Sequence, residues 1–232
     1  AAWQSALGLF ASMPGLGVAP DVISCDAVIS ACEKGGKWEL ALAFLASMPR
    51  LRIAPTVVTC NAAICACEAG VRWQLALAML ASMLELHIPP NVISCSSAVS
   101  ACEKAAQWQA ALAVLASMPE LQVAPNAFTC SSAISACEAD GQWRIAVALF
   151  ASMHQLRVAP NVVSCNAAIS ACERASRWQG AIALFAGMPA LRVAANAVVC
   201  GSVLDACERG DRRLGVVSSC LEMYLVGIML LS

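Results

Sequence analysis

Of the 232 residues in this chain, 60% are hydrophobic and only 12% are charged, and the net charge is −1. A chain this apolar must either lie in lipid or bury its apolar surface in a long core. Up to Arg213, polar residues interrupt every apolar stretch before it reaches the roughly 18 residues that a membrane-spanning helix needs. We therefore expect a soluble protein with no membrane partner, and the near-zero charge gives no overall attraction for nucleic acid.

A period of 35 residues runs through the chain. Successive tryptophans from Trp3 to Trp178 are all 35 residues apart, and two cysteine rows, Cys25 to Cys200 and Cys32 to Cys207, follow the same period. Such self-similarity predicts tandem repeats. The expected units are a half repeat at 1–21, with helix B only, and six repeats at 22–56, 57–91, 92–126, 127–161, 162–196 and 197–231, the last of them degenerate.

The first complete repeat begins with an amphipathic pattern. Val22, Cys25, Ile29 and Cys32 stand at i, i+3, i+7 and i+10, the spacing that places side chains on one face of a helix. We name this predicted element helix A and expect it at the same place in every repeat.

A second pattern follows a break at Gly35-Gly36. From Trp38 to Met48 the apolar residues return to the helical period, which predicts helix B, and Pro49 ends it because proline cannot continue a helix interior. Short breaks make the two helices antiparallel, and a pair with two apolar faces must stack on its neighbours. The predicted fold is all-α, an α-solenoid superhelix of two-helix repeats with helix A on the inside.

The two ends of the chain depart from this pattern. Arg213 stands where other repeats have tryptophan, and Met223 to Leu231 is a nine-residue apolar run, too short to span a membrane. We expect that run to pack on further sequence or on another protein. The chain begins at Ala1 without methionine or a targeting segment, so we also expect a fragment of a longer protein.

Fourteen cysteines raise the question of disulfides or a metal site. Cys25 and Cys32 are about 10 Å apart along one helix, too far for a bridge, and no C-x-x-C occurs. We expect buried, reduced thiols with no metal or cofactor, and we expect the tryptophans to be core residues. His87 and His154 have no partner for nucleophilic catalysis nearby in the sequence, so neither an enzyme nor a small-molecule substrate is expected.

The unit resembles the repeat of the pentatricopeptide repeat proteins over the whole chain. That repeat opens with two apolar residues and Thr-Tyr-Asn, carries Ala early in helix B, ends helix B near Met and closes with Pro-Asp or Pro-Asn. Here residues 57–61 read Val-Val-Thr-Cys-Asn, followed by Ala76, Met83 and Pro90-Asn91. Cysteine replaces the tyrosine, and tryptophan replaces the aliphatic residue that opens helix B, which puts the local packing in question.

The resemblance implies sequence-selective binding of single-stranded RNA, one base per repeat. In the family, the fifth residue of helix A and the last residue of the unit read the base together. The matching pairs are Asp26 and Thr56, Asn61 and Asn91, Ser96 and Asn126, Ser131 and Asn161, and Asn166 and Asn196. Short polar side chains suit hydrogen bonds to a base edge, whereas helix capping alone is the alternative role of the last-place residues.

The family's pairing rules then predict a base order. The two Asn–Asn pairs resemble pairs that favour a pyrimidine, C before U, and the two Ser–Asn pairs resemble pairs that favour A. Family members lie parallel to RNA from 5′ to 3′, so the expected core is C-A-A-C. Asp26 with Thr56 matches no rule that we can read, and Gly201 with Leu231 offers no side-chain readout.

Two further rows follow from the resemblance. In the family, the second residue of helix A inserts between successive bases. Here that place holds Ile23, Val58, Ile93, Phe128, Val163 and Val198, and packing between repeats is the alternative role of these side chains. A basic residue late in helix A contacts phosphate in the family, and a solvated charged face is the alternative; these residues are Lys34, Lys104, Arg174 and Arg209. Glutamates precede them and add repulsion unless Lys37, Arg72, Arg177 and Arg212, each four residues beyond a glutamate, partly neutralise it.

The main alternative function is a protein-binding scaffold without RNA specificity. The neutral charge, the glutamate row and the two gaps in the basic row favour it. The resemblance instead implies organellar RNA processing, stabilisation or translation, in a mitochondrion or chloroplast.

Overall fold

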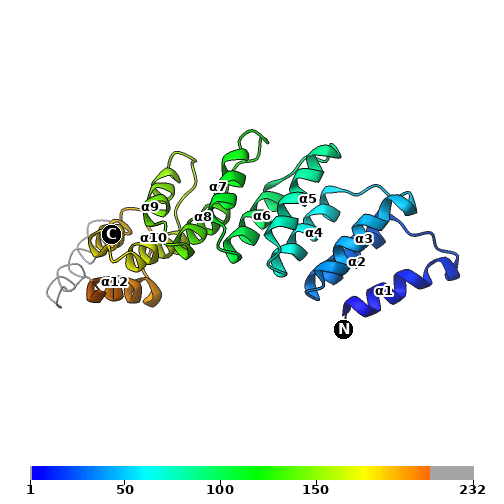
Figure 1. Cartoon of the computed structure of the whole chain (residues 1–232), viewed down its shortest axis with the longest axis horizontal. Helices are drawn as coiled ribbons and strands as arrows, with labels where there is room; N and C mark the ends of the chain where they lie inside the picture. The colour runs from blue at the N-terminus through cyan, green and yellow to red at the C-terminus, as the bar shows by residue number, and fades with distance from the viewer. Residues whose placement is uncertain (1, 210–232) are drawn as a thin grey trace. The chain divides into compact units, whose positions relative to one another are not determined.

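The computed structural model describes residues 2–209, and within that range every regular element is a helix (Figure 1). The helix A elements are α2 (Val22–Lys34), α4 (Val57–Ala69), α6 (Val92–Lys104), α8 (Ala127–Ala139), α10 (Val162–Arg174) and α12 (Ala197–Arg209). The helix B elements are α1 (Ala2–Ser12), α3 (Trp38–Ser47), α5 (Trp73–Glu85), α7 (Trp108–Ser117), α9 (Trp143–Ser152) and α11 (Trp178–Gly187). Short 3-10 helices follow two of them, η1 (Pro14–Leu16) and η2 (Met48–Leu51). The apolar run from Met223 to Leu231 lies outside the described residues.

Each helix A begins at a side chain that caps it. The residue before the helix accepts a hydrogen bond from the backbone N–H three residues on, over 2.8–3.3 Å, at Asp21, Thr56, Asn91, Asn126, Asn161 and Asn196. At α2, α4, α6 and α10 the third helical residue is Ser or Thr, and its hydroxyl accepts from the backbone of the capping residue in return. Such reciprocal capping fixes where each helix A starts.

Within the described residues, the helices form two compact units, one of residues up to 105 with 116–124 and one of residues 106–115 with those from 125 to 209. In the first unit α2 packs on α1, α3 and α4, and α4 packs on α5 and α6. In the second unit α10 packs on α8, α9, α11 and α12. Each unit therefore stacks helix A on helix A with helix B behind it, and the predicted all-α solenoid of two-helix repeats is confirmed.

Small apolar residues and thiols fill the space between these helices. Cys25, Cys32, Ala41 and Met48 are fully buried in the first complete repeat, and their counterparts recur in later repeats. All described cysteines are free thiols, and all are buried except Cys65 and Cys200, which are half-buried. Burial raises the pKa of Cys67, Cys102, Cys137 and Cys165 to about 11. These thiols are therefore protonated and poorly reactive at neutral pH. Their burial confirms that part of the prediction from the sequence.

Residues 2–209 contain neither a candidate membrane-spanning helix nor a candidate metal site. None of the helices in this range combines the length and the apolar composition that crossing a bilayer requires. No three of the His, Cys, Asp or Glu side chains in the same range come together in a way that could hold a metal ion.

Candidate nucleic-acid interface

The fold brings fifth-place and last-place residues into contact although about thirty residues separate them. In the first unit Asn61 Nδ2 donates to Asn91 Oδ1 over 3.2 Å, and in the second unit Ser131 Oγ lies 3.4 Å from Asn161 Oδ1. The contact arises because the last residue of a repeat caps the following helix A, which packs on the preceding helix A. Two of the predicted pairs are therefore direct neighbours.

The last-place asparagines cap helices but keep a free donor. Asn91 Oδ1 accepts from the backbone N–H groups of Ile93 and Ser94 at 2.9 and 3.0 Å, so the capping role is real. This orients the amide, and its Nδ2 has no hydrogen-bond partner among residues 2–209. The same holds at Asn126, Asn161 and Asn196, whose oxygens accept from the third helical residue. Capping and base contact are thus compatible in one side chain.

Three of the fifth-place side chains are largely covered. Asn61, Ser96 and Ser131 are 9, 8 and 4% exposed. The serines are short enough to turn back on their own helix, where they donate to the backbone carbonyls of Ile93 at 3.2 Å and Ala127 at 2.7 Å. These three side chains therefore offer little free surface to a base, and their role in base reading stays a prediction.

The second-place residues form an exposed apolar row. Large apolar side chains are usually buried, yet these six are 51–73% exposed: Ile23, Val58, Ile93, Phe128, Val163 and Val198. Inter-repeat packing therefore does not account for them. Each stands two residues after a capping residue, so within each unit these apolar residues lie beside the polar pairs.

The basic row is paired with glutamates of the preceding repeat. Lys104 lies 2.9 Å from Glu68, Arg174 lies 3.8 Å from Glu138, and Arg209 lies 3.3 Å from Glu173. All three cations remain about half exposed, so the ion pairs are open to solvent and to salt. These cations reach phosphate only in competition with a carboxylate.

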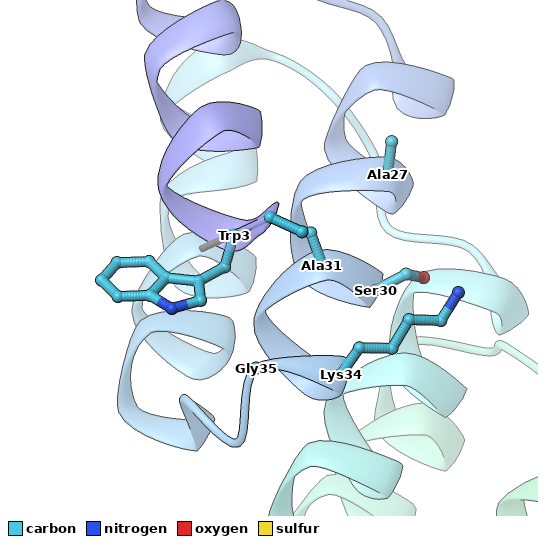
Figure 2. A pocket seen from close by; sticks show the side chains of 7 residues that line it. Trp3, Ala27, Ser30, Ala31, Lys34 and Gly35 are labelled. Carbon is cyan, nitrogen blue, oxygen red and sulfur yellow. The ribbon is translucent and has the colours of Figure 1, made fainter.

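Lys34 differs from the other members of the basic row. It forms no salt bridge with any residue from 2 to 209 and lines a cavity of about 550 Å³ together with Ser30, Ala31 and Trp3. Figure 2 shows Ser30 and Lys34 extending from α2 on the side away from the Trp3 ring. It is thus the one predicted phosphate contact that the described residues leave unpaired.

The cations four residues beyond the glutamates have another partner than predicted. Each lies over the tryptophan ring that opens the preceding helix B: Lys37 over Trp3 at 5.6 Å, Arg72 over Trp38 at 4.8 Å, and Arg177 over Trp143 at 5.1 Å. The proposed neutralisation of glutamate is therefore wrong for these three, because they lie beyond the helix end and turn towards the indole. The fourth predicted cation, Arg212, lies outside the described residues. The tryptophans are half-buried, and Trp3, Trp38, Trp108, Trp143 and Trp178 pack against the buried core. The recurrence of a cation 34 residues after a tryptophan was the signal that sequence reasoning missed.

Comparison with protein families decides what kind of repeat this is. Residues 8–69, 78–139 and 113–174 match the family described as "Pentatricopeptide repeat domain", and residues 163–193 match "PPR repeat". The chain belongs to the pentatricopeptide repeat family. Among curated proteins, a search by sequence gives no match.

Solved pentatricopeptide repeat structures share the fold of this chain. One is the pentatricopeptide repeat protein PPR10 in complex with an 18-nt psaJ RNA element, at 22% identity and a TM-score of 0.75, with 99% of this chain and 33% of that chain covered. PPR10 from maize matches at 25% identity and a TM-score of 0.69, with 99% of this chain and 32% of that chain covered. The PPR domain of Arabidopsis thaliana protein-only RNase P 1, in complex with tRNA, matches at 13% identity and a TM-score of 0.57, with 72% of this chain and 84% of that chain covered. The chain thus spans about a third of the length of PPR10.

Proposed function

We propose that this chain binds single-stranded RNA with sequence selectivity, one base per repeat. The observation that carries the proposal is the exposed apolar row beside the contacting polar pairs. Pentatricopeptide repeat structures similar to this chain hold RNA, which supports the same class of ligand here. We extend the proposal, on family resemblance, to RNA processing, stabilisation or translation in a mitochondrion or chloroplast.

The repeat closed by Asn91 illustrates the chemistry. A base inserted between Val58 and Ile93, which are 55 and 51% exposed, would remove apolar surface from water on both of its faces. The free Nδ2 of Asn91 would donate to an acceptor on the Watson–Crick edge, and both pyrimidines carry such acceptors. The chain needs only to bind and orient the base, so the proposal includes no catalysis.

Polar substitution of the apolar row tests the proposal. Ile93→Ser and Val163→Ser should each weaken retention of single-stranded RNA about threefold, since aliphatic contacts offer less than the roughly 1–3 kcal/mol of aromatic stacking. Leu75→Ser, at a helix B residue that is 37% exposed, is the matched control and should leave RNA affinity unchanged. Filter binding of folded variants measures this. Equal affinity in all three variants and the wild type would remove the proposal.

One observation favours the alternative of a protein-binding scaffold. The ion pairs at Lys104, Arg174 and Arg209 reduce the positive charge available to phosphate. Four free contacts would give a salt slope of about −2.8 on single strands, and pairing should make the slope shallower. Salt-sensitive RNA retention supports RNA binding, whereas the absence of retention at low salt supports the scaffold.

A further inference from the structure

A hydroxyl group anchors the fifth-place side chain in two repeats. Thr59 Oγ1 donates to Asp26 Oδ1 and Ser94 Oγ donates to Asn61 Oδ1, both over 2.5 Å and both from a residue 33 positions further along the chain. The donors occupy the third place of the following helix A and are fully buried. At Asn61 the second half of the amide is held as well, because its Nδ2 donates to Asn91. Its orientation is therefore fixed before any base arrives.

Asn166 lacks this anchor. The residue 33 positions beyond it is Val199, which is fully buried and has no hydroxyl group. Within residues 2–209, Asn166 Oδ1 is a buried side-chain oxygen without a hydrogen-bond partner. The helix A of Asn166 packs on the helix A of Val199, as the helix A of Asn61 packs on that of Ser94. Two repeats with the same Asn–Asn pair in the sequence thus hold their fifth-place amides differently.

We propose that Val199 is a positioning residue that lowers base discrimination by the repeat at 162–196. This inference rests on the proposed RNA binding. An anchored amide presents one fixed arrangement of donor and acceptor to a base edge, whereas an unanchored amide can turn either group towards it. The repeat of Asn166 therefore distinguishes bases less sharply than the repeat of Asn61, although the pairing rules treat them as equal.

A double-mutant cycle in the full chain tests the anchoring. Val199→Thr changes one methyl group to a hydroxyl group and should stabilise the fold, partly by capping at Asn196 and partly by a hydrogen bond to Asn166. In an Asn166→Ala background only the capping part remains. Urea unfolding should give a coupling of about fivefold in the unfolding equilibrium constant, the size of one net hydrogen bond. No coupling would overturn the proposal.

Base discrimination provides the readout that a purely structural role would not change. In the wild type, replacing C by A opposite the repeat at 162–196 should raise the Kd about threefold less than the same change opposite the repeat at 57–91. Val199→Thr should remove that difference, and Ser94→Val should lower discrimination opposite the repeat at 57–91 instead. Discrimination unmoved by Val199→Thr would overturn the role of Val199. A complete lack of RNA binding would remove the proposed function and this role together, while the coupling would still report whether Asn166 is anchored.

Discussion

Val71 holds a backbone conformation that valine disfavours. Its φ is 55°, in the left-handed region, at the turn between α4 and α5, and glycines occupy the matching turns with φ of 64° at Gly36 and 72° at Gly141. A β-branched side chain is strained there, and the Val71 side chain is 46% exposed, so little packing would be lost on its removal. Val71→Gly should raise the free energy of unfolding by about 1 kcal/mol, measured by urea denaturation. The reciprocal Gly36→Val should lower it by a similar amount, and an opposite sign in either variant would contradict the argument.

Glu33 makes stability depend on pH. Burial raises the pKa of this carboxyl, and the charge of Glu68 adds to the effect. The folded state therefore binds this proton more tightly than the unfolded state does, so stability is gained at pH values below the unfolded pKa and lost as the pH rises through the folded pKa. Glu33→Gln should raise the midpoint of thermal unfolding at pH 7 and leave it unchanged at pH 3. A larger gain at pH 3 than at pH 7 would contradict this assignment.

The sequence predicted which residues share a face but not how their side chains use it. Phe128 and Ser131 are three residues apart, a spacing that puts them on one side of helix A, yet Phe128 is 55% exposed and Ser131 only 4% exposed. The difference arises because a serine hydroxyl can bond to its own helix, whereas a phenyl ring cannot. Likewise, the sequence offered capping as the alternative role of Asn91 but did not show that a capping asparagine keeps a free amide nitrogen, since this depends on the direction of one side chain.

The ion pairs between neighbouring A helices oppose phosphate binding. Glu68 accepts from Lys104 at 2.9 Å and from Ser100 at 2.8 Å. Glu68→Gln should free the ammonium group of Lys104 and increase RNA affinity about threefold at low salt, the scale of an exposed ion pair. Filter binding at two salt concentrations should also show a steeper salt dependence. The gain should vanish in a variant that also carries Lys104→Gln, and a gain that survives there would show another cause.

Proline follows several B helices, although α9 also ends at Ser152 with His154 in the matching place, and α5 gives a test. Helix α3 ends at Ser47 ahead of Pro49, whereas α5 carries Leu84 at the matching place and continues to Glu85. Leu84→Pro should therefore cost less than about 1 kcal/mol, because the other repeats already accommodate this residue there. Ala81→Pro, one turn earlier and inside the helix, should cost about 3 kcal/mol. Thermal unfolding of both variants checks this, and equal losses would contradict it.

At the level of the molecule, the 35-residue period was sufficient to predict the fold. Repeated Cys, Ala and Met positions impose the same packing in every unit, so helix type and stacking followed from spacing alone. The division into two compact units was not predicted, because the period continues without interruption through residues 92–126. The pairing of cations with carboxylates and indoles of neighbouring repeats also escaped prediction, since it depends on side-chain contacts between helices.

The proposal that each repeat reads one base is tested by measuring the affinity of the full chain for short RNAs in which one base at a time is changed. An RNA with a central C-A-A-C should bind at least about tenfold tighter than its complement. Each single change in those four bases should weaken binding by roughly 1 kcal/mol or more, except for a smaller loss at the final C. Equal affinity for C-A-A-C and its complement would contradict sequence-selective recognition by this chain.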